Sequence, residues 1–120
     1  MHRIAQNGLR NVLVHVGALK GREQPRKAPA IITQATNRQD YILAPESGIF
    51  EIALDLGAKV KKGQIVGWIH HLERPDRAPE EIIAQSAGYL ITMRAPCLTQ
   101  QGDCVAVIAR QVSEREVLRA

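Results

Sequence analysis

The sequence predicts a mainly β fold built from two related halves and preceded by one α-helix and a linker. Between residues 41 and 110, short apolar runs alternate with glycines, as is typical of strands joined by tight turns. These runs recur after about 40 residues, which indicates an internal repeat. Aromatic residues make up only 3% of the 120 residues, whereas 45% are hydrophobic. The core must therefore consist mostly of Ile, Val, Leu and Ala, which suits thin β-packing within one domain.

The N-terminal segment, residues 1–21, is predicted to be helical, with the helix itself over residues 3–19. Gly21 is a natural C-terminal stop. Gly8 and Gly17 each weaken a helix by about 1 kcal/mol relative to Ala, and such glycines often mark close packing against another element. One face of the helix carries the apolar residues at spacings of three and four, so we expect it to need a partner surface: Ala5, Leu9, Val12, Leu13, Val16 and Leu19.

Residues 22–40 are predicted to hold a linker and a short strand. The prolines and basic residues of 20–30 oppose regular structure. Residues 31–36 have the pattern of a strand, and residues 37–40 that of a turn. At the other end of the chain, residues 111–120 form a charged tail with one or two helical turns.

The repeat defines the main domain, residues 41–110. Each half has the order strand, turn, strand, loop, turn, strand, and the offset changes from 40 to 39 in the connecting loop. Glycines are expected at tight reversals, where the chain needs a positive φ or a close backbone approach. Each half has one apolar face that it cannot bury alone, so we expect the halves to close into a small barrel with few free edges. Three matched pairs carry the repeat: Ala44 with Ala84, Gly48 with Gly88, and Gly63 with Gly102.

The net charge of +4 is concentrated in the first third of the chain. Residues 1–40 contain seven Lys or Arg against two acidic residues, a local charge of +5. A nucleic-acid surface usually adds aromatic residues that stack on bases, and this segment contains none. We therefore expect a solvated basic face and no nucleic-acid partner.

The two cysteines, Cys97 and Cys104, are too few for a disulfide framework. We interpret both as small apolar residues of a strand or turn in a reducing compartment. No run approaches the roughly 18 apolar residues that a membrane span needs, and the N-terminus has no signal-peptide pattern. The sequence therefore predicts a cytoplasmic protein with no membrane partner.

The phrase Ala44-Pro45-x-x-Gly48, followed by Gly57-x-x-Val60-Lys61-Lys62-Gly63-Gln64, resembles the biotinyl/lipoyl-like barrel-sandwich hybrid. The resemblance implies two halves related by a pseudo-twofold axis. Carrier domains of that fold bear a modified lysine in the hairpin that joins the halves. Here that hairpin, residues 70–81, has no lysine, and no lysine follows Lys62 anywhere in the chain. We therefore do not expect a carrier function.

A closer resemblance covers residues 3–112. It is carried by Gly8-Leu9-Arg10-Asn11-Val12-Leu13, Gly48-Ile49-Phe50, Asp55-Leu56-Gly57, Arg74-Pro75 and Gly102-Asp103-Cys104-Val105-Ala106-Val107-Ile108-Ala109. Together these motifs resemble the C-terminal region of the succinylglutamate desuccinylase/aspartoacylase family, most closely its members that deacylate diaminobutyrate-type substrates. On this resemblance, helix 1–21 matches the end of the catalytic domain and residues 41–110 match the barrel-sandwich domain that follows it.

The resemblance implies a hydrolase family of zinc amidohydrolases. Their zinc is held by a His-x-x-Glu pair and a distant His, with a Glu as general base, all in an N-terminal catalytic domain. None of these motifs has a matching position here. We therefore assign no catalytic, cofactor-binding or metal residue, and expect zinc only in the catalytic domain of a longer parent enzyme.

One further motif has the spacing of a metal site: His70 and Glu73 form His-x-x-Glu, and His71 lies between them. A catalytic zinc needs three protein ligands, and the other histidines, His2 and His15, lie on the predicted helix. We expect an exposed polar hairpin. The alternative is a hairpin that leans over the active-site mouth of the parent enzyme.

Three other side chains have structural interpretations. His15 is expected to be a packed or capping histidine, and Phe50 and Trp68 to be core or interface anchors.

Two functional hypotheses follow. The first is an accessory, non-catalytic domain of a zinc-dependent amidohydrolase acting on N-acylated amino acids, inactive alone and partnered by the catalytic domain. The second is a stand-alone scaffold that forms a homo-oligomer with other copies of the chain through its N-terminal helix.

Overall fold

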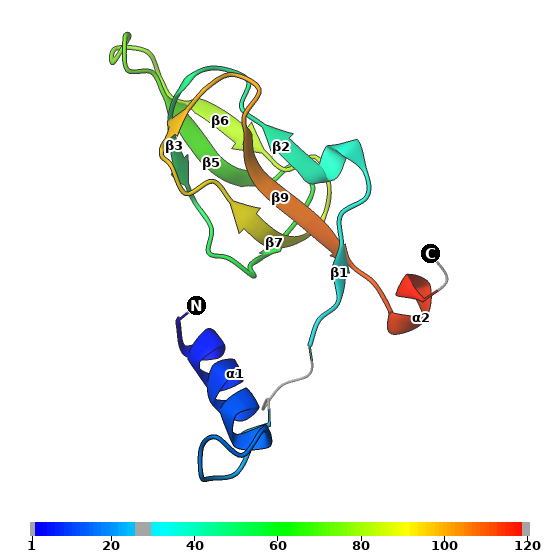
Figure 1. The fold of residues 1–120 in the computed structure, drawn as a ribbon. Coiled ribbons are helices and arrows are strands. Elements are labelled where there is room, and N and C mark those ends of the chain that lie inside the picture. The colour runs from blue at the N-terminus through cyan, green and yellow to red at the C-terminus, as the bar shows by residue number, and fades with distance from the viewer. Residues whose placement is uncertain (1, 26–29, 119–120) are drawn as a thin grey trace. The chain divides into compact units, whose positions relative to one another are not determined.

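The computed structural model describes residues 2–25 and 30–118, which divide into an N-terminal unit up to residue 30 and a larger unit from residue 31 onward. The protein is mainly β, with one N-terminal helix and antiparallel sheets (Figure 1). The elements are α1 (His2–His15), β1 (Thr33–Gln34), a 3-10 turn η1 (Arg38–Asp40), β2 (Tyr41–Leu43), β3 (Gly48–Ile52), β4 (Lys59–Val60), β5 (Ile65–His70), β6 (Glu80–Ile83), β7 (Gly88–Met93), β8 (Leu98–Thr99), β9 (Cys104–Gln111) and α2 (Glu114–Val117).

The N-terminal helix ends earlier than predicted. Residues 3–19 were expected to be helical, but α1 stops at His15. The stop is Gly17 and not Gly21, because Gly17 adopts a φ of 77°, a left-handed conformation that ends many helices. The amide of Leu19 then bonds back to the carbonyl of Leu13 at 3.0 Å, so the last predicted turn becomes a C-terminal cap.

The apolar face of α1 is exposed. Leu9 is 63% and Val16 is 66% exposed, and Ile4 and Val12 are more than half exposed. Side chains at Gly8 or Gly17 would meet no atom within 4 Å. The close packing expected at these glycines is therefore not made by the described residues.

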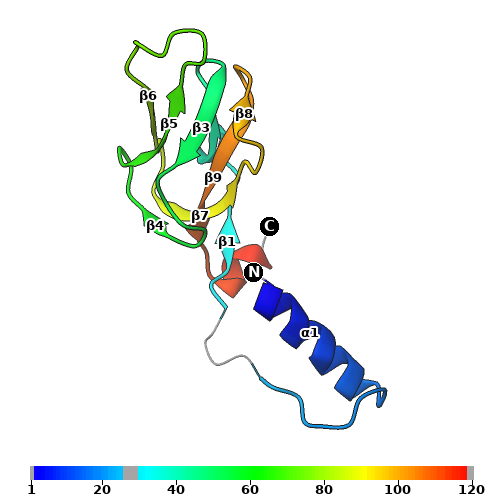
Figure 2. The same cartoon turned by 90° about the vertical axis from the view of Figure 1, so that its left-hand side faces the viewer.

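The larger unit consists of two antiparallel sheets (Figures 1 and 2). One has the order β1-β9-β7-β4, with β2 also paired to β9, and the other has the order β6-β5-β3-β8. Each sheet contains strands from both halves of the repeat. The predicted small barrel is not closed, because no strand pairing joins the two sheets within residues 30–118. Strands β4 and β8 are only two residues long and each pairs with a single neighbour, so neither bridges the sheets.

The pairing of strands confirms the internal repeat. Strand β2 pairs with β9 as β6 pairs with β5, and both pairings contain a register shift. Equivalent backbone hydrogen bonds also recur in the two halves. The amide of Ala44 donates to the carbonyl of Asp103 at 2.8 Å, and that of Ala84 donates to the carbonyl of Gln64 at 2.9 Å.

One hydrophobic core is shared by the two halves, and it is aliphatic as predicted apart from Phe50. Burying one such side chain fully stabilises a fold by about 1.5–3 kcal/mol. Apart from Val60 and Ala106, its members occupy equivalent positions of the repeat, so the apolar face of each half is covered by the other: Ile42 and Ile82, Ala44 and Ala84, Phe50 and Leu90, Val66 and Val105, Ile69 and Ile108.

The glycines of the repeat have the two roles that were predicted. A Cβ at Gly48 would collide with the carbonyl of His70, and one at Gly88 with the carbonyl of Ala109. These two positions therefore allow close backbone approach between strands. Gly63 and Gly102 instead have φ values of 83° and 89°, which favour glycine.

Residues 31–40, which precede the repeat, contain a shorter strand than predicted, and side-chain hydrogen bonds hold their turn. Residues 31–36 contribute only β1, which pairs with the end of β9. The turn at 37–40 contains η1, and the buried Asp40 carboxylate accepts bonds from the amides of Thr36 and Asn37 at 3.0 and 2.9 Å. Residues 26–29 of the expected linker lie outside the described residues.

The C-terminal tail contains the short helix that was predicted. Helix α2 is capped by Ser113, whose hydroxyl accepts a bond from the amide of Glu116. Residues 119–120 lie outside the described part of the chain. Cys97 precedes β8 and Cys104 begins β9, and both are exposed free thiols. Among the described helices, none has the length and apolar character needed to cross a bilayer.

Candidate functional site

The most developed site on the larger unit is a groove beside the loop that joins β5 to β6. This connecting loop, residues 71–79, follows His70 and precedes Glu80. With the turn before β3, residues 46–48, and strand β8 with the turn after it, residues 98–101, it borders a groove of about 660 Å³. The groove is therefore built from three connections and the strand ends beside them. Its charged and polar lining includes Glu46, Ser47, His71, Glu73, Arg74, Arg77 and Gln101.

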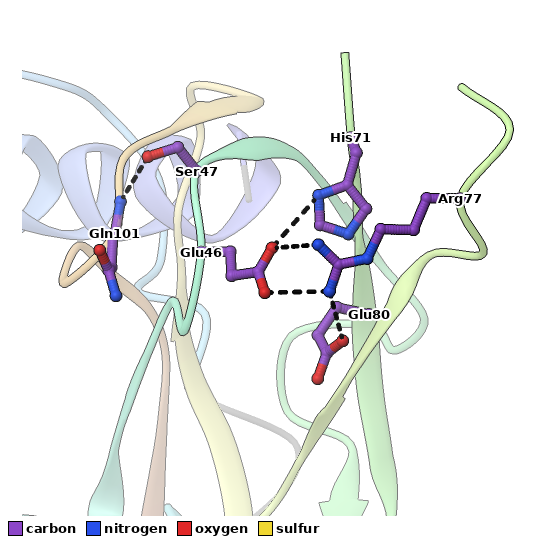
Figure 3. A network of polar contacts seen from close by, with 6 residues as sticks. All are labelled: Glu46, Ser47, His71, Arg77, Glu80 and Gln101. Atoms are coloured by element: carbon purple, nitrogen blue, oxygen red, sulfur yellow. Dashed lines mark hydrogen bonds and ion pairs between the residues drawn. The ribbon is translucent and has the colours of Figure 1, made fainter. Parts of the chain in front are cut away.

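A bidentate ion pair fastens the connecting loop to the first turn (Figure 3). The two terminal guanidinium nitrogens of Arg77 bond the two carboxylate oxygens of Glu46 at 2.9 and 3.0 Å. The Nδ1 atom of His71 lies 3.5 Å from the same carboxylate, and Arg77 also lies 3.8 Å from Glu80. Planar two-point pairing fixes orientation as well as distance, so Glu46 sets the position of the loop.

This pairing changes the acidity of both partners. The hydrogen bond from Arg77 is the main cause that lowers the pKa of the Glu46 carboxyl, and the nearby charges of Arg77 and His71 act in the same direction. The hydrogen bond to Glu46 raises the pKa of Arg77 in turn. Both groups are therefore held in their charged forms at neutral pH.

A second contact joins the other two walls of the groove. The amide of Gln101 donates to the hydroxyl of Ser47 at 2.9 Å (Figure 3). In the second half of the repeat, the residues equivalent to Glu46 and Ser47 are Ser86 and Ala87. That half forms the same turn, so the turn does not require the carboxylate or the hydroxyl.

The structure separates the histidines that were considered as metal ligands. The Nε2 atom of His70 lies 2.6 Å from a carboxylate oxygen of Glu51, whereas His71 faces Glu46. The two neighbouring side chains thus serve different carboxylates, and Glu73 lines the groove without bonding either histidine. Across residues 2–25 and 30–118, no group of three or more His, Cys, Asp or Glu side chains is placed to hold a metal ion.

The other singled-out residues have mixed outcomes. Phe50 is a core residue as predicted, and Trp68 is half-buried. His15 is neither packed nor buried: its side chain is 78% exposed, and its Nδ1 atom lies 2.8 Å from Glu23. The early end of α1 leaves His15 in the last turn, where Glu23 folds back to meet it.

Sequence reasoning did not single out Glu46 or Arg77. The two residues are 31 positions apart, and only the fold brings them together. One signal was present in the sequence, since Glu46 and Ser47 depart from their counterparts in an otherwise matched turn.

Comparison with known proteins gives a consistent set of relatives. No protein-family model matches the sequence. The chain is 32% identical over 109 residues to the N-alpha-acetyl-L-2,4-diaminobutyric acid deacetylase of Halomonas elongata, a match that covers 91% of this chain and 32% of that enzyme.

Solved structures show the same relationship. A succinylglutamate desuccinylase/aspartoacylase from Rhodobacter sphaeroides matches with a TM-score of 0.73 and 30% identity over 93% of this chain and 35% of its own. The product-bound ectoine utilization protein EutE (DoeB) from Ruegeria pomeroyi matches with a TM-score of 0.72 and 37% identity over 90% of this chain and 32% of its own. The chain thus spans about a third of each of these proteins, and it matches their C-terminal part.

Proposed function

We propose that this chain is a non-catalytic accessory part of a zinc-dependent amidohydrolase that acts on N-acylated amino acids. Its connecting loop would shape or cover an active site formed by a separate catalytic part. The observation that carries the proposal is the match to the C-terminal third of a deacetylase and of desuccinylase-type enzymes. The same match supports N-acyl amino-acid chemistry as the setting.

The loop has the properties that such a role requires. A surface that shapes a neighbouring site must hold its position, because a misplacement of about 1 Å in a positioning group reduces catalysis strongly. Arg77 and His71 both bond or face Glu46, so the loop is held at two points. The exposed apolar face of α1 offers a second surface for docking on the catalytic part.

The residues that the structure describes do not form a zinc site. A catalytic zinc site needs three protein ligands, and the described residues place no three such side chains together. In the proposal the ligands of the zinc belong to the catalytic part, and this chain contributes shape and charge.

We also propose that the larger unit is a barrel-sandwich hybrid of two pseudo-symmetric halves. Support comes from the equivalent strand pairings of the two halves and from the core residues that recur at equivalent positions.

The proposal predicts that the isolated chain does not hydrolyse N-alpha-acetyl-L-2,4-diaminobutyric acid when zinc is added. Release of acetate is the measurement, with the Halomonas elongata deacetylase as positive control. Metal analysis after dialysis should show far less than one zinc per chain. Hydrolysis together with stoichiometric zinc would contradict the accessory role.

A stand-alone scaffold that associates through α1 is the second candidate, because the helix exposes Leu9 and Val12. Sedimentation of the wild-type chain and of Leu9→Glu separates the two functions. A tight dimer that Leu9→Glu dissociates would favour the scaffold. A monomer at micromolar concentration would favour the accessory part.

A further inference from the structure

We propose that the outer face of the sheet β6-β5-β3-β8 is a docking surface for the catalytic part, and that it binds an arginine or lysine side chain of that part over the indole of Trp68. This inference rests on the proposed function and specifies which surface of the larger unit meets the partner, and with what chemistry. We call this surface the Trp68 face, and its members are Ile49, Glu51, Trp68, Glu81, Ile83 and Leu98.

The alternation of side chains along the strands places these residues on the side of the sheet away from the core. Phe50, Ile69 and Ile82 are buried in the core, and their neighbours along each strand point to the opposite side. Figure 2 shows the four strands side by side. Leu98 is 65% exposed, and Trp68 is half-buried. The Trp68 face therefore combines open apolar side chains with the one Trp of the sequence.

Two carboxylates flank Trp68 across the sheet. Trp68 lies directly opposite Glu51 on β3 and directly opposite Glu81 on β6, and the Cβ atoms of such cross-strand neighbours are about 4.5–5.5 Å apart. The Nε2 atom of His70 lies 2.6 Å from Oε2 of Glu51, so one oxygen of that carboxylate is engaged. Glu81 is exposed, and its side chain has no hydrogen bond or ion pair to any residue that the structure describes. A cation over the indole would thus have a carboxylate on each side.

This arrangement favours a cation that is carried on an apolar stem. The face of an indole ring attracts Arg and Lys within about 6 Å of its centre, and the two carboxylates attract the same charge. The neighbouring rows of the sheet are apolar, with Ile49 opposite Leu98 and Ile65 opposite Ile83. The methylene stems of Arg and Lys pack well on such surface. Because Trp and Arg are enriched among the residues that dominate binding at interfaces, the chemistry fits a protein partner.

The internal repeat shows that the fold does not require the charged row. Tyr41 pairs with Val107 in one half as Glu81 pairs with Trp68 in the other. At the positions equivalent to the charged row, the other half has no charge: Ile91 for Glu51, Val107 for Trp68 and Tyr41 for Glu81. The two carboxylates beside Trp68 are therefore not a consequence of strand pairing.

The Trp68 face is continuous with the groove, which points to the catalytic part as its partner. Leu98 lines the groove and pairs with Ile49 on the Trp68 face. Trp68 and His70 lie on the same strand, and the connecting loop follows His70 directly. A partner whose active site lay beneath this loop would therefore also lie against the Trp68 face.

Trp68 emission in the full 120-residue chain tests the cation site, because the sequence has no other Trp. The probes are N-acetyl-L-argininamide and its uncharged analogue N-acetyl-L-citrullinamide, at low salt. We expect saturable quenching by the arginine probe alone. Contacts of this kind are individually weak, so Glu81→Gln should raise Kd about two- to fivefold. Glu114→Gln, which changes an exposed carboxylate on α2, should leave Kd unchanged.

An equal response to the two probes, or a response that Glu81→Gln leaves unchanged, would overturn the cation site. Hydroxyl-radical footprinting then tests the occupant. Oxidation of Trp68 is compared between the free chain and a graft in which the chain replaces the matching third of the Halomonas elongata deacetylase. We expect at least fivefold slower oxidation of Trp68 in the graft, and Glu81→Lys should restore part of it. Tyr41, which is 47% exposed on the other sheet, should be oxidised equally in both.

Equal oxidation of Trp68 in the graft and the free chain would overturn the docking surface. Protection that increases with the concentration of the free chain would assign this surface to a second copy, and would overturn it as well. An active graft with unprotected Trp68 would contradict the docking surface and leave the accessory role standing. Hydrolysis by the free chain would contradict the accessory role, whereas the quenching of Trp68 would still report the cation site.

Discussion

Glu46 is the residue on which the groove depends, because it accepts bonds from Arg77 and faces His71. Its partner is distant in sequence and its counterpart in the repeat is Ser86. The carboxylate therefore serves the connecting loop and not the turn that contains it. Because this carboxylate is ionised, we expect the stability of the folded protein to depend on pH through it.

We predict that Glu46→Gln lowers stability at neutral pH and has little effect in acid. The fold lowers the pKa of Glu46 below its ordinary 4.5, so the ionised form is favoured in the folded state. This stabilisation is present above pH 4.5 and is lost as the pH falls through the folded-state pKa. Thermal unfolding of wild type and variant at pH 7 and at an acid pH well below 4.5 should converge on the acid side.

Glu81→Gln is the matched control, since Glu81 is an exposed carboxylate on β6 with no ion pair in the described structure. It should leave the melting temperature unchanged at both pH values. A difference between wild type and Glu46→Gln that persists at the acid pH would show that the carboxylate charge is not what holds the loop.

Single residues were predictable where local pattern decides their place. Phe50 reaches the core because alternation along one strand puts it on the apolar face. The contact between Glu46 and Arg77 was not predictable, because a loop and a turn far apart in sequence must first be placed by the sheets. His15 was misjudged since its environment depends on where the helix ends.

At the level of elements, the strands of the two halves were the most predictable feature. Each strand pattern occurs twice in the sequence, once in each half of the repeat, and both copies form the same pairings. The helix end and the extent of β1 were not predicted correctly. The helix end depends on which of two glycines, Gly17 or Gly21, stops the helix. The extent of β1 depends on how much of β9 is free to pair with it. A local sequence pattern decides neither.

The close approach of strands at the matched glycines makes stability sensitive to an added methyl group there. Gly48→Ala should destabilise the protein by about 1–3 kcal/mol, because the added methyl group collides with the carbonyl of His70 and forces the strands apart. Gly8→Ala is the contrasting variant: nothing lies within 4 Å of its Cβ, and helix propensity should favour the helix by about 0.5–1 kcal/mol.

Urea unfolding followed by circular dichroism measures both changes. Loss of stability in Gly48→Ala with none in Gly8→Ala is the expected pattern. Equal stability of Gly48→Ala and wild type would mean that the strands do not approach as closely as described.

On the scale of the whole molecule, two sheets share one core, and each sheet draws strands from both halves. Because the core is built from both halves, we expect the two halves to fold as one cooperative unit. The repeat in the sequence predicted this shared core. The predicted closure of the two halves into a barrel was wrong, because two-residue strands at the sheet edges leave the barrel open. The exposed stripe on α1 and the groove are both open to a partner.

A graft into a related enzyme tests the accessory role most directly. The chain would replace the matching third of the Halomonas elongata deacetylase, and kcat/KM would be measured with N-alpha-acetyl-L-2,4-diaminobutyric acid. We expect the zinc-loaded graft to retain activity within about tenfold of the parent, a change of about 1.4 kcal/mol in barrier. Arg77→Gln in the graft should lower kcat/KM, whereas Lys62→Gln should not. A folded, zinc-loaded graft without activity, or a deacetylase that is equally active without the segment, would contradict the account.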